Sequence, residues 1–273
     1  MKNEKVVKLF LSVCLLAMIF VPLHTALAGD KGVEDLAKAS QNPVSSLISV
    51  PFETNINFNA GPEDETDVIT NIKPVVPMSL TKNWNLINRI IIPAISQGSR
   101  GPGLGREFGL GDITYQGFIS PAEAGKVIWG IGPQIGMPTG MDRATSDHWT
   151  LGPSAVVLVM PGKWVIGALV SNVWNIGDGY NDAADVNAFT FQYFINYNMP
   201  GGWYLSMAPT ITANWEADSD NTWTIPVGGA IGRVFKIGKQ PVNMKAGAYY
   251  NVEKPDNASD WTLQFGLTFM FPK

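Results

Sequence analysis

The stretch WYLSMAPTITANW, residues 203–215, decides the fold class. Every second residue from Trp203 through Leu205 and Met207 to Ile211 is apolar, and the residues between them are mostly small or polar. Alternation with a period of two predicts a β-strand with one apolar and one polar face. Because the polar face carries Ser, Thr and Asn, and a tryptophan stands at each end, the pattern favours a strand that separates lipid from water.

The composition of the whole chain agrees with membrane-facing strands. Only 15% of the 273 residues are charged, while 45% are hydrophobic, and soluble domains carry about 25% charged residues. Blocks of about 20 apolar residues, which helical membrane proteins need, are missing from the sequence. The net charge of −4 comes without a basic block, which argues against a nucleic-acid-binding protein.

The first 28 residues have the pattern of a secretory signal peptide. Three lysines among the first eight residues precede an apolar run over 9–23, and Ala26-Leu27-Ala28 is a small-x-small cleavage site. The alternative, an anchor helix, needs a longer run. The only cysteine, Cys14, lies inside this run, so the exported chain has no disulfide and no cysteine metal site.

Beyond a short helix at 33–41, which Asn42-Pro43 should end, we predict twelve strands. They cover 47–59, 68–80, 84–96, 110–121, 126–137, 149–161, 163–176, 187–199, 202–215, 222–236, 240–253 and 261–271. Short turns follow the even strands, and long polar loops follow the odd ones, at 60–67, 97–109, 138–148, 177–186, 216–221 and 254–260.

Short turns at one end of the strands and long loops at the other predict an all-β, up-and-down antiparallel barrel of the outer membrane with both termini in the periplasm. In this interpretation residues 29–46 form a periplasmic segment with the short helix, and residues 47–273 form the barrel. Several prolines fall inside the proposed strands, among them Pro74, Pro77, Pro93, Pro133, Pro153, Pro209 and Pro226. Since proline cannot donate to a ladder, we expect bulges or breaks there.

Tryptophan positions support the two edges of a membrane. Trp164 and Trp174 are ten residues apart on one face, which in a strand tilted by about 40° separates them by about 25 Å in height. Eight of the nine tryptophans are predicted to form two aromatic girdles: Trp84, Trp149, Trp164, Trp174, Trp203, Trp215, Trp223 and Trp261.

Several segments resemble a bacterial outer-membrane family labelled MetA-pathway of phenol degradation, or transporter, some of whose members carry the name neuromedin U. The resemblance covers essentially all of the exported chain. It is carried by Asp35–Lys38 with Gln41–Pro43, Leu47–Phe52, Trp84–Ile87, Leu110–Ile113, Leu151–Ala155, Ile211–Glu216 and Gly238–Asn243. It implies a porin-like transport barrel and, weakly, an aromatic solute, but the family offers no defined catalytic or ligand residues.

Strand parity assigns a set of polar residues to the lumen. The predicted pore-lining residues are Glu53, Lys73, Arg89, Asp112, Gln192, Asn214 and Lys245. The three bases fall near mid-strand with one acid, so we expect a net-positive constriction that favours anions. The alternative is a closed barrel whose charges pair. The 33–41 helix and the 97–109 loop, which carries Arg100 and Arg106, are both candidates for a plug.

The sequence predicts no enzyme, cofactor or metal. His148, beside Ser146 and Asp147, is the only histidine after the signal peptide, and we interpret it as a loop residue rather than part of a hydrolase. Acidic clusters in the long loops suggest solubility, or cations that bridge lipopolysaccharide. The expected partners are outer-membrane lipid and lipopolysaccharide, the barrel-assembly machinery and a small solute. The leading function is passive uptake, and the alternative is a structural or adhesive barrel.

Overall fold

The computed structural model describes residues 31–101, 103–123, 125–141, 144–177 and 184–272. The predicted signal peptide lies outside these residues. One α-helix, α2 (Lys31–Ser40), precedes the strands, close to the predicted 33–41. No helix in the described ranges is long and apolar enough to cross a membrane.

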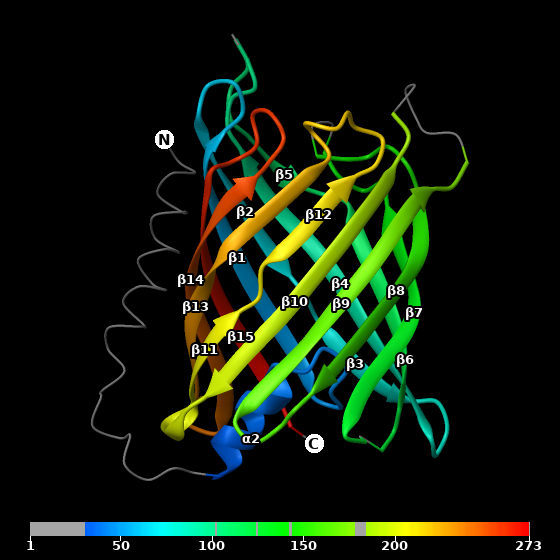
Figure 1. Cartoon of the computed structure of the whole chain (residues 1–273), viewed down its shortest axis with the longest axis vertical. Helices are drawn as coiled ribbons and strands as arrows, with labels where there is room; N and C mark the ends of the chain where they lie inside the picture. The colour runs from blue at the N-terminus through cyan, green and yellow to red at the C-terminus, as the bar shows by residue number, and fades with distance from the viewer. Residues whose placement is uncertain (1–30, 102, 124, 142–143, 178–183, 273) are drawn as a thin grey trace.

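Fifteen strand segments form one antiparallel sheet that closes on itself (Figure 1). They are β1 (Ile48–Ala60), β2 (Glu65–Ile72), β3 (Val75–Ser79), β4 (Trp84–Gln97), β5 (Glu107–Leu110), β6 (Ile113–Pro121), β7 (Val127–Met137), β8 (Thr150–Val159), β9 (Trp164–Asn175), β10 (Asn187–Asn198), β11 (Trp203–Met207), β12 (Thr210–Asn214), β13 (Trp223–Ile237), β14 (Gln240–Glu253) and β15 (Trp261–Phe271). Closure comes from β1 against β15, with Ile48 opposite Phe271 and Phe58 opposite Trp261.

The predicted twelve-strand barrel is confirmed. Three of the twelve membrane-crossing strands, which we call staves, are each interrupted once, and this divides the sheet into fifteen segments. The pairs β2 and β3, β5 and β6, and β11 and β12 each continue one stave, since both members pair with the same neighbour. Two breaks fall at Lys73-Pro74 and Ala208-Pro209, where the proline has no N–H for the ladder. The third falls at Gly111-Asp112.

Other prolines are accommodated without a break. Pro133 on β7 lies directly opposite Pro153 on β8, so two residues without N–H groups face each other and no donor is left unpaired. Pro226 on β13 sits beside a register shift against β14, which is the bulge expected for a proline inside a sheet.

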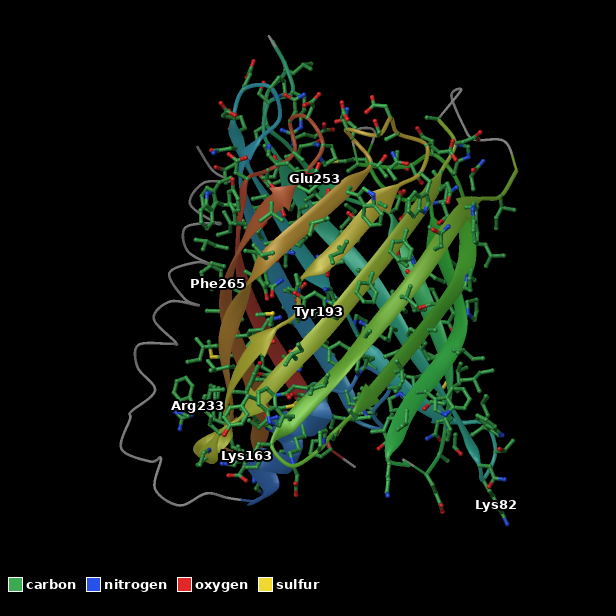
Figure 2. All side chains as sticks on the ribbon, in the orientation of Figure 1. Lys82, Lys163, Tyr193, Arg233, Glu253 and Phe265 are labelled. Atoms are coloured by element: carbon green, nitrogen blue, oxygen red, sulfur yellow. The ribbon has the colours of Figure 1, made fainter. Side chains whose placement is uncertain are left out.

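The pleat turns apolar side chains outward. Along β9, Trp164, Ile166 and Val170 are exposed, whereas Val165 and Leu169 between them are buried inside. Figure 2 shows the same outward direction for Phe265 on β15. Large exposed apolar side chains lie on β3 to β11 and on β13 to β15, as in a barrel surrounded by lipid.

Tryptophans mark both edges of this apolar band. Trp164 and Trp174, at the two ends of β9, are 42% and 46% exposed, and Trp164 packs on Tyr197 at 4.8 Å between ring centroids. Trp129, which the sequence sets further into its strand, packs edge-on against Trp84 at 6.0 Å. It therefore joins the girdle at the end where the short turns lie.

Helix α2 packs inside the end of the barrel where β15 finishes (Figure 1). Ala37 joins a buried cluster with Leu47, Tyr204, Val234 and Met270. The helix contacts β10, β13, β14 and the short helix η2 (Pro200–Gly202). Its apolar face thus covers the lower end of the lumen.

Candidate functional site

Three charged side chains meet in the middle of the lumen, and a fourth, Arg89, lies within electrostatic reach of Glu53. Glu53 on β1 accepts a hydrogen bond from Lys73 at 2.6 Å and one from Lys245 at 3.4 Å. The two lysines reach it from opposite sides, since Lys73 follows β2 and Lys245 lies on β14. All three side chains are 21–24% exposed, so the ion pairs are partly shielded from water.

Arg89 on β4 belongs to the same interior layer but is less well satisfied. Its Nε and Nη1 atoms are buried and have no hydrogen-bond partner within the described chain. Counting Glu53 against Lys73, Lys245 and Arg89, three positive charges face one negative charge. A buried guanidinium with unused donors is a site for an incoming acceptor such as a carboxylate.

A polar cavity of about 250 Å³ rises from this charged layer. It extends from Glu53 to Ser259, in the loop that precedes β15, and passes Tyr249 and Gln264. Three asparagines, three threonines and two prolines complete most of its wall: Asn55, Asn57, Asn251, Thr210, Thr224, Thr262, Pro209 and Pro226. The cavity is a water-compatible chamber in the half of the barrel that carries the long loops.

The other half of the lumen contains apolar side chains. An apolar cluster inside the barrel combines residues of five strands with Val44 of the N-terminal segment: Ile87, Phe118, Val156, Leu158, Val165, Leu169 and Phe194. Ile87, Phe118 and Val165 have no exposed surface. This apolar floor and α2 occupy the barrel on the short-turn side of the charged layer.

Polar bonds hold the N-terminal segment in place. Gln41 and Asn198 exchange two hydrogen bonds between their side-chain amides, at 2.9 and 3.1 Å. Lys38 donates to the carbonyl of Gly162 at 2.7 Å, and Asn243 donates to Ser40 at 3.3 Å. The N-terminal segment with α2, which we call the plug, is thus attached to the wall by a few hydrogen bonds as well as by its apolar face.

The remaining predicted pore-lining residues lie at different heights. Gln192 on β10 donates to the Ala208 carbonyl at 3.2 Å, where β11 and β12 are interrupted. Asp112 and Asn214 lie at strand ends, where Asp112 accepts from the backbone of Gly140 and Ser146 and Asn214 from Glu216. The structure therefore brings together Glu53, Lys73, Arg89 and Lys245, and it uses Asp112 and Asn214 to order loops.

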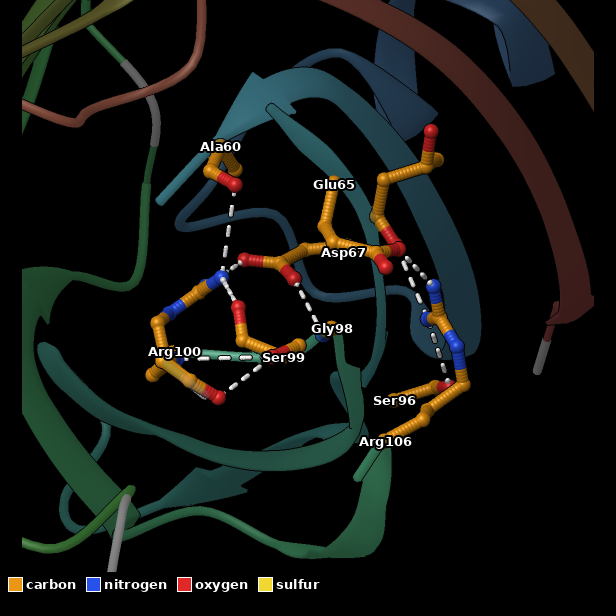
Figure 3. Close-up of polar contacts among 10 residues, drawn as sticks. Ala60, Glu65, Asp67, Ser96, Gly98, Ser99, Arg100 and Arg106 are labelled. Atoms are coloured by element: carbon orange, nitrogen blue, oxygen red, sulfur yellow. Dashed lines mark hydrogen bonds and ion pairs between the residues drawn. The ribbon is translucent and has the colours of Figure 1, made fainter. Parts of the chain in front are cut away.

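The 97–109 loop is fastened to the neighbouring stave (Figure 3). Arg100 pairs with Asp67, and Arg106 pairs with Glu65 at 3.0 Å. Asp67 also accepts from the Gly98 amide at 2.7 Å. These contacts attach the loop to β2 and neutralise part of the acidic cluster at 60–67. The loop's role as a plug stays a prediction.

The group around His148 has the geometry of an ordered loop. The Ser146 hydroxyl donates to Asp112 at 2.9 Å and lies 3.2 Å from the His148 carbonyl oxygen. A catalytic serine would instead donate to the imidazole. One of the acidic clusters noted in the long loops includes Asp178 and Asp182 of the 177–186 loop, which lie outside the described residues.

The comparison with family models covers most of the barrel. Residues 51–238 match the model described as "Putative MetA-pathway of phenol degradation". The chain belongs to this family. No curated protein matches it in sequence. The resemblance noted in the sequence is thereby confirmed.

Solved structures establish the fold of this family member independently. A COG4313 outer membrane channel from Pseudomonas putida F1 aligns with a TM-score of 0.62 at 18% identity, covering 82% of this chain and 94% of that one. The NanC porin aligns with a TM-score of 0.52 at 11% identity, covering 81% and 98%. Together with the closed wall, they place the chain in the outer membrane.

The apolar floor is the feature that sequence reasoning missed. The signal was present in residues 155–159 and 164–170, which are apolar on both faces of their strands. A continuous apolar run indicates a strand that is buried on both sides. Here one side faces lipid and the other faces Val44, whose position depends on the folding back of the N-terminal segment.

Proposed function

We propose that the protein is a channel for passive uptake of small solutes, and that it favours those bearing a carboxylate or phenolate on an aromatic ring. The observation that carries this proposal is the layered lumen, in which a polar chamber leads to a net-positive layer above an apolar floor. Charge inside a narrow lumen acts at short range and low dielectric, so it outweighs loop charges that salt screens beyond about 8–10 Å.

The two ends of such a solute fit the two layers. Arg89 has donors that no described residue accepts, and these are available to the acid group. Ile87 and Phe118 of the apolar cluster have no exposed surface in this structure, so they would contact the ring only when the floor opens. The family's description names phenol degradation, and one structural relative is named as an outer membrane channel. The family's description supports an aromatic solute, and the name of the relative supports a channel.

Passage requires the plug to move. Because α2 and the apolar floor occupy the lower half, we expect small and infrequent conductance steps from the intact chain. Deletion of residues 31–46 removes the helix and Val44, and should raise the open probability in a planar bilayer. The predicted leader and residues 29–30 stay in place, so that export is unaffected.

Selectivity tests the role of the charged layer. The triple change K73Q, R89Q and K245Q should shift the reversal potential in a salt gradient toward cations, and E53Q alone should shift it toward anions. A matched triple, K82Q, K126Q and K239Q, removes the same charge from the short turns and should leave the reversal potential unchanged. Equal shifts from both triples would contradict the proposal.

The alternative is a non-conducting structural or adhesive barrel, and the apolar lower half favours it. If neither the intact chain nor the 31–46 deletion gives conductance steps, this alternative replaces the channel. We expect no enzymatic activity, since the hydroxyl of Ser146 is directed to Asp112.

A further inference from the structure

An apolar groove of about 450 Å³ lies on the lipid-facing wall. It is lined by one residue of β9 and by residues of β10, β11 and β13: Trp164, Ile195, Tyr197, Leu205, Ser206, Met207, Gly229 and Ala230. Strand register places Trp164 opposite Tyr197, Tyr197 opposite Leu205, and Leu205 opposite Ile231. The groove therefore crosses four adjacent staves at the level of the lower girdle.

The groove follows from a gap in the ladder. The pairing of β11 with β13 runs from Trp203 to Ser206, and the pairing of β12 with β13 resumes at Thr212. Between them residues 207–211 make no ladder contact with β13. Gly229 lies opposite this gap and has no side chain to fill it. The wall is thus hollowed on its outer side over several residues.

Two cations stand at the periplasmic end of the groove (Figure 2). The Lys163 ammonium lies 6.0 Å from the centre of the Tyr197 ring. The Arg233 guanidinium lies 5.1 Å from the Trp203 ring and donates to the Gly201 carbonyl at 3.4 Å. Both side chains are held on aromatic faces at the depth where lipid headgroups lie.

The dimensions match one lipid molecule. Arg233 and Gly229 are four residues apart on β13, which corresponds to about 10 Å of depth at a tilt of about 40°. Lys163 and Arg233 are separated by three strand spacings, about 14 Å, which two long side chains can reduce. Charge at one end and an apolar channel leading inward are complementary to a phosphate with acyl chains.

We propose that this groove is a specific site for an anionic glycerophospholipid of the periplasmic leaflet. Its phosphate lies between Lys163 and Arg233, and one acyl chain runs past Trp164 and Leu205 to Met207. A second copy of this chain is a weaker candidate, because exposed bases at the rim would face their own counterparts in a symmetric contact.

Native mass spectrometry of the exported barrel in detergent tests the site. Dioleoylphosphatidylglycerol is the probe, and dioleoylglycerol, with the same chains and no phosphate, is its control. We expect one phosphatidylglycerol to be retained and no dioleoylglycerol. The double change K163Q and R233Q should reduce retention about tenfold or more, since each charge-assisted bond contributes roughly a factor of ten.

Filling the groove should have the same effect as removing the charges. Met207 is 44% exposed and lines the groove, whereas Val157 on β8 is 48% exposed and does not. M207W should lose the lipid, and V157W and K126Q should keep it, with folding of each checked by heat-dependent gel mobility. Equal loss in the control variants, retention by M207W, or a lipid-free dimer would each overturn the proposal.

Discussion

The cost of placing a charge on the outer wall should depend on its depth in the membrane. Val170 on β9 is six residues from Trp164 and four from Trp174, which places it about 15 Å and about 10 Å from the two girdles. It is therefore within about 3 Å of the midplane. Arginine at the midplane costs about 2–4 kcal/mol, falling to about 0–1 kcal/mol near the interface.

We expect Val170→Arg to lower the free energy of unfolding by about 2–4 kcal/mol. Val127→Arg is the matched control, because Val127 is also lipid-facing, at 52% exposed against 37% for Val170, and begins β7 at the girdle. Its cost should be about 0–1 kcal/mol. Denaturant titration of barrels folded into vesicles measures both. Equal costs would refute the assigned depth, and no cost for Val170→Arg would refute the outward assignment.

Three further predictions follow from other parts of the barrel. Gly132→Ala should destabilise by about 1–3 kcal/mol, as overpacking does, because an added Cβ would lie 1.7 Å from the Gly117 carbonyl oxygen; Gly105→Ala, with open space, should be neutral in the same titration. Asp67→Asn should release the 97–109 loop, because it removes the charged partner of Arg100 and weakens the hydrogen bond from the Gly98 amide. Limited proteolysis of folded protein should then cut this loop at least several times faster, whereas cutting of the 254–260 loop should not change. The Asp260 carboxylate accepts a hydrogen bond from Asn59 and pairs with Lys254, and these contacts hold its pKa below the ordinary 3.8. The order that they add to the loop is fully present above pH 3.8 and is lost as the pH falls through the lowered pKa. Hydrogen exchange of residues 254–260 should therefore rise at low pH relative to a D260N variant, in which the pH step is absent.

Much of the wall was predictable because contact with lipid requires apolar side chains at every second position of each strand. Period-two alternation, as in 203–215, and the sorting of loops by length predict strand number, order and direction. Bulges or breaks were expected at prolines inside strands, since proline has no donor for the ladder, and two of the three breaks fall at Lys73-Pro74 and Ala208-Pro209. These features depend on local chemistry alone. Which prolines break the ladder was not predictable from the sequence.

The inside of the barrel was less predictable, because it depends on which residues meet across the lumen. Parity placed Glu53, Lys73 and Lys245 on the inner face, but Glu53 and Lys245 are 192 positions apart in the sequence, so their contact could not be predicted. Asp112 was on the correct parity, yet its height directs it to loop amides. The floor around Val44 required knowledge of how the N-terminal segment folds back.

The position of α2 sets an order on assembly. The helix is synthesised and exported before the barrel strands, yet Ser40 bonds to Asn243, which lies 203 residues later. Contacts between residues so distant in sequence form late, because the loop between them must close first. The helix can thus take its place only after β13 and β14 have joined the wall, so the lumen of a nascent barrel stays open until the last strands pair. Newly inserted protein should therefore admit small labelling reagents to a cysteine at Asn196 more rapidly than mature protein does.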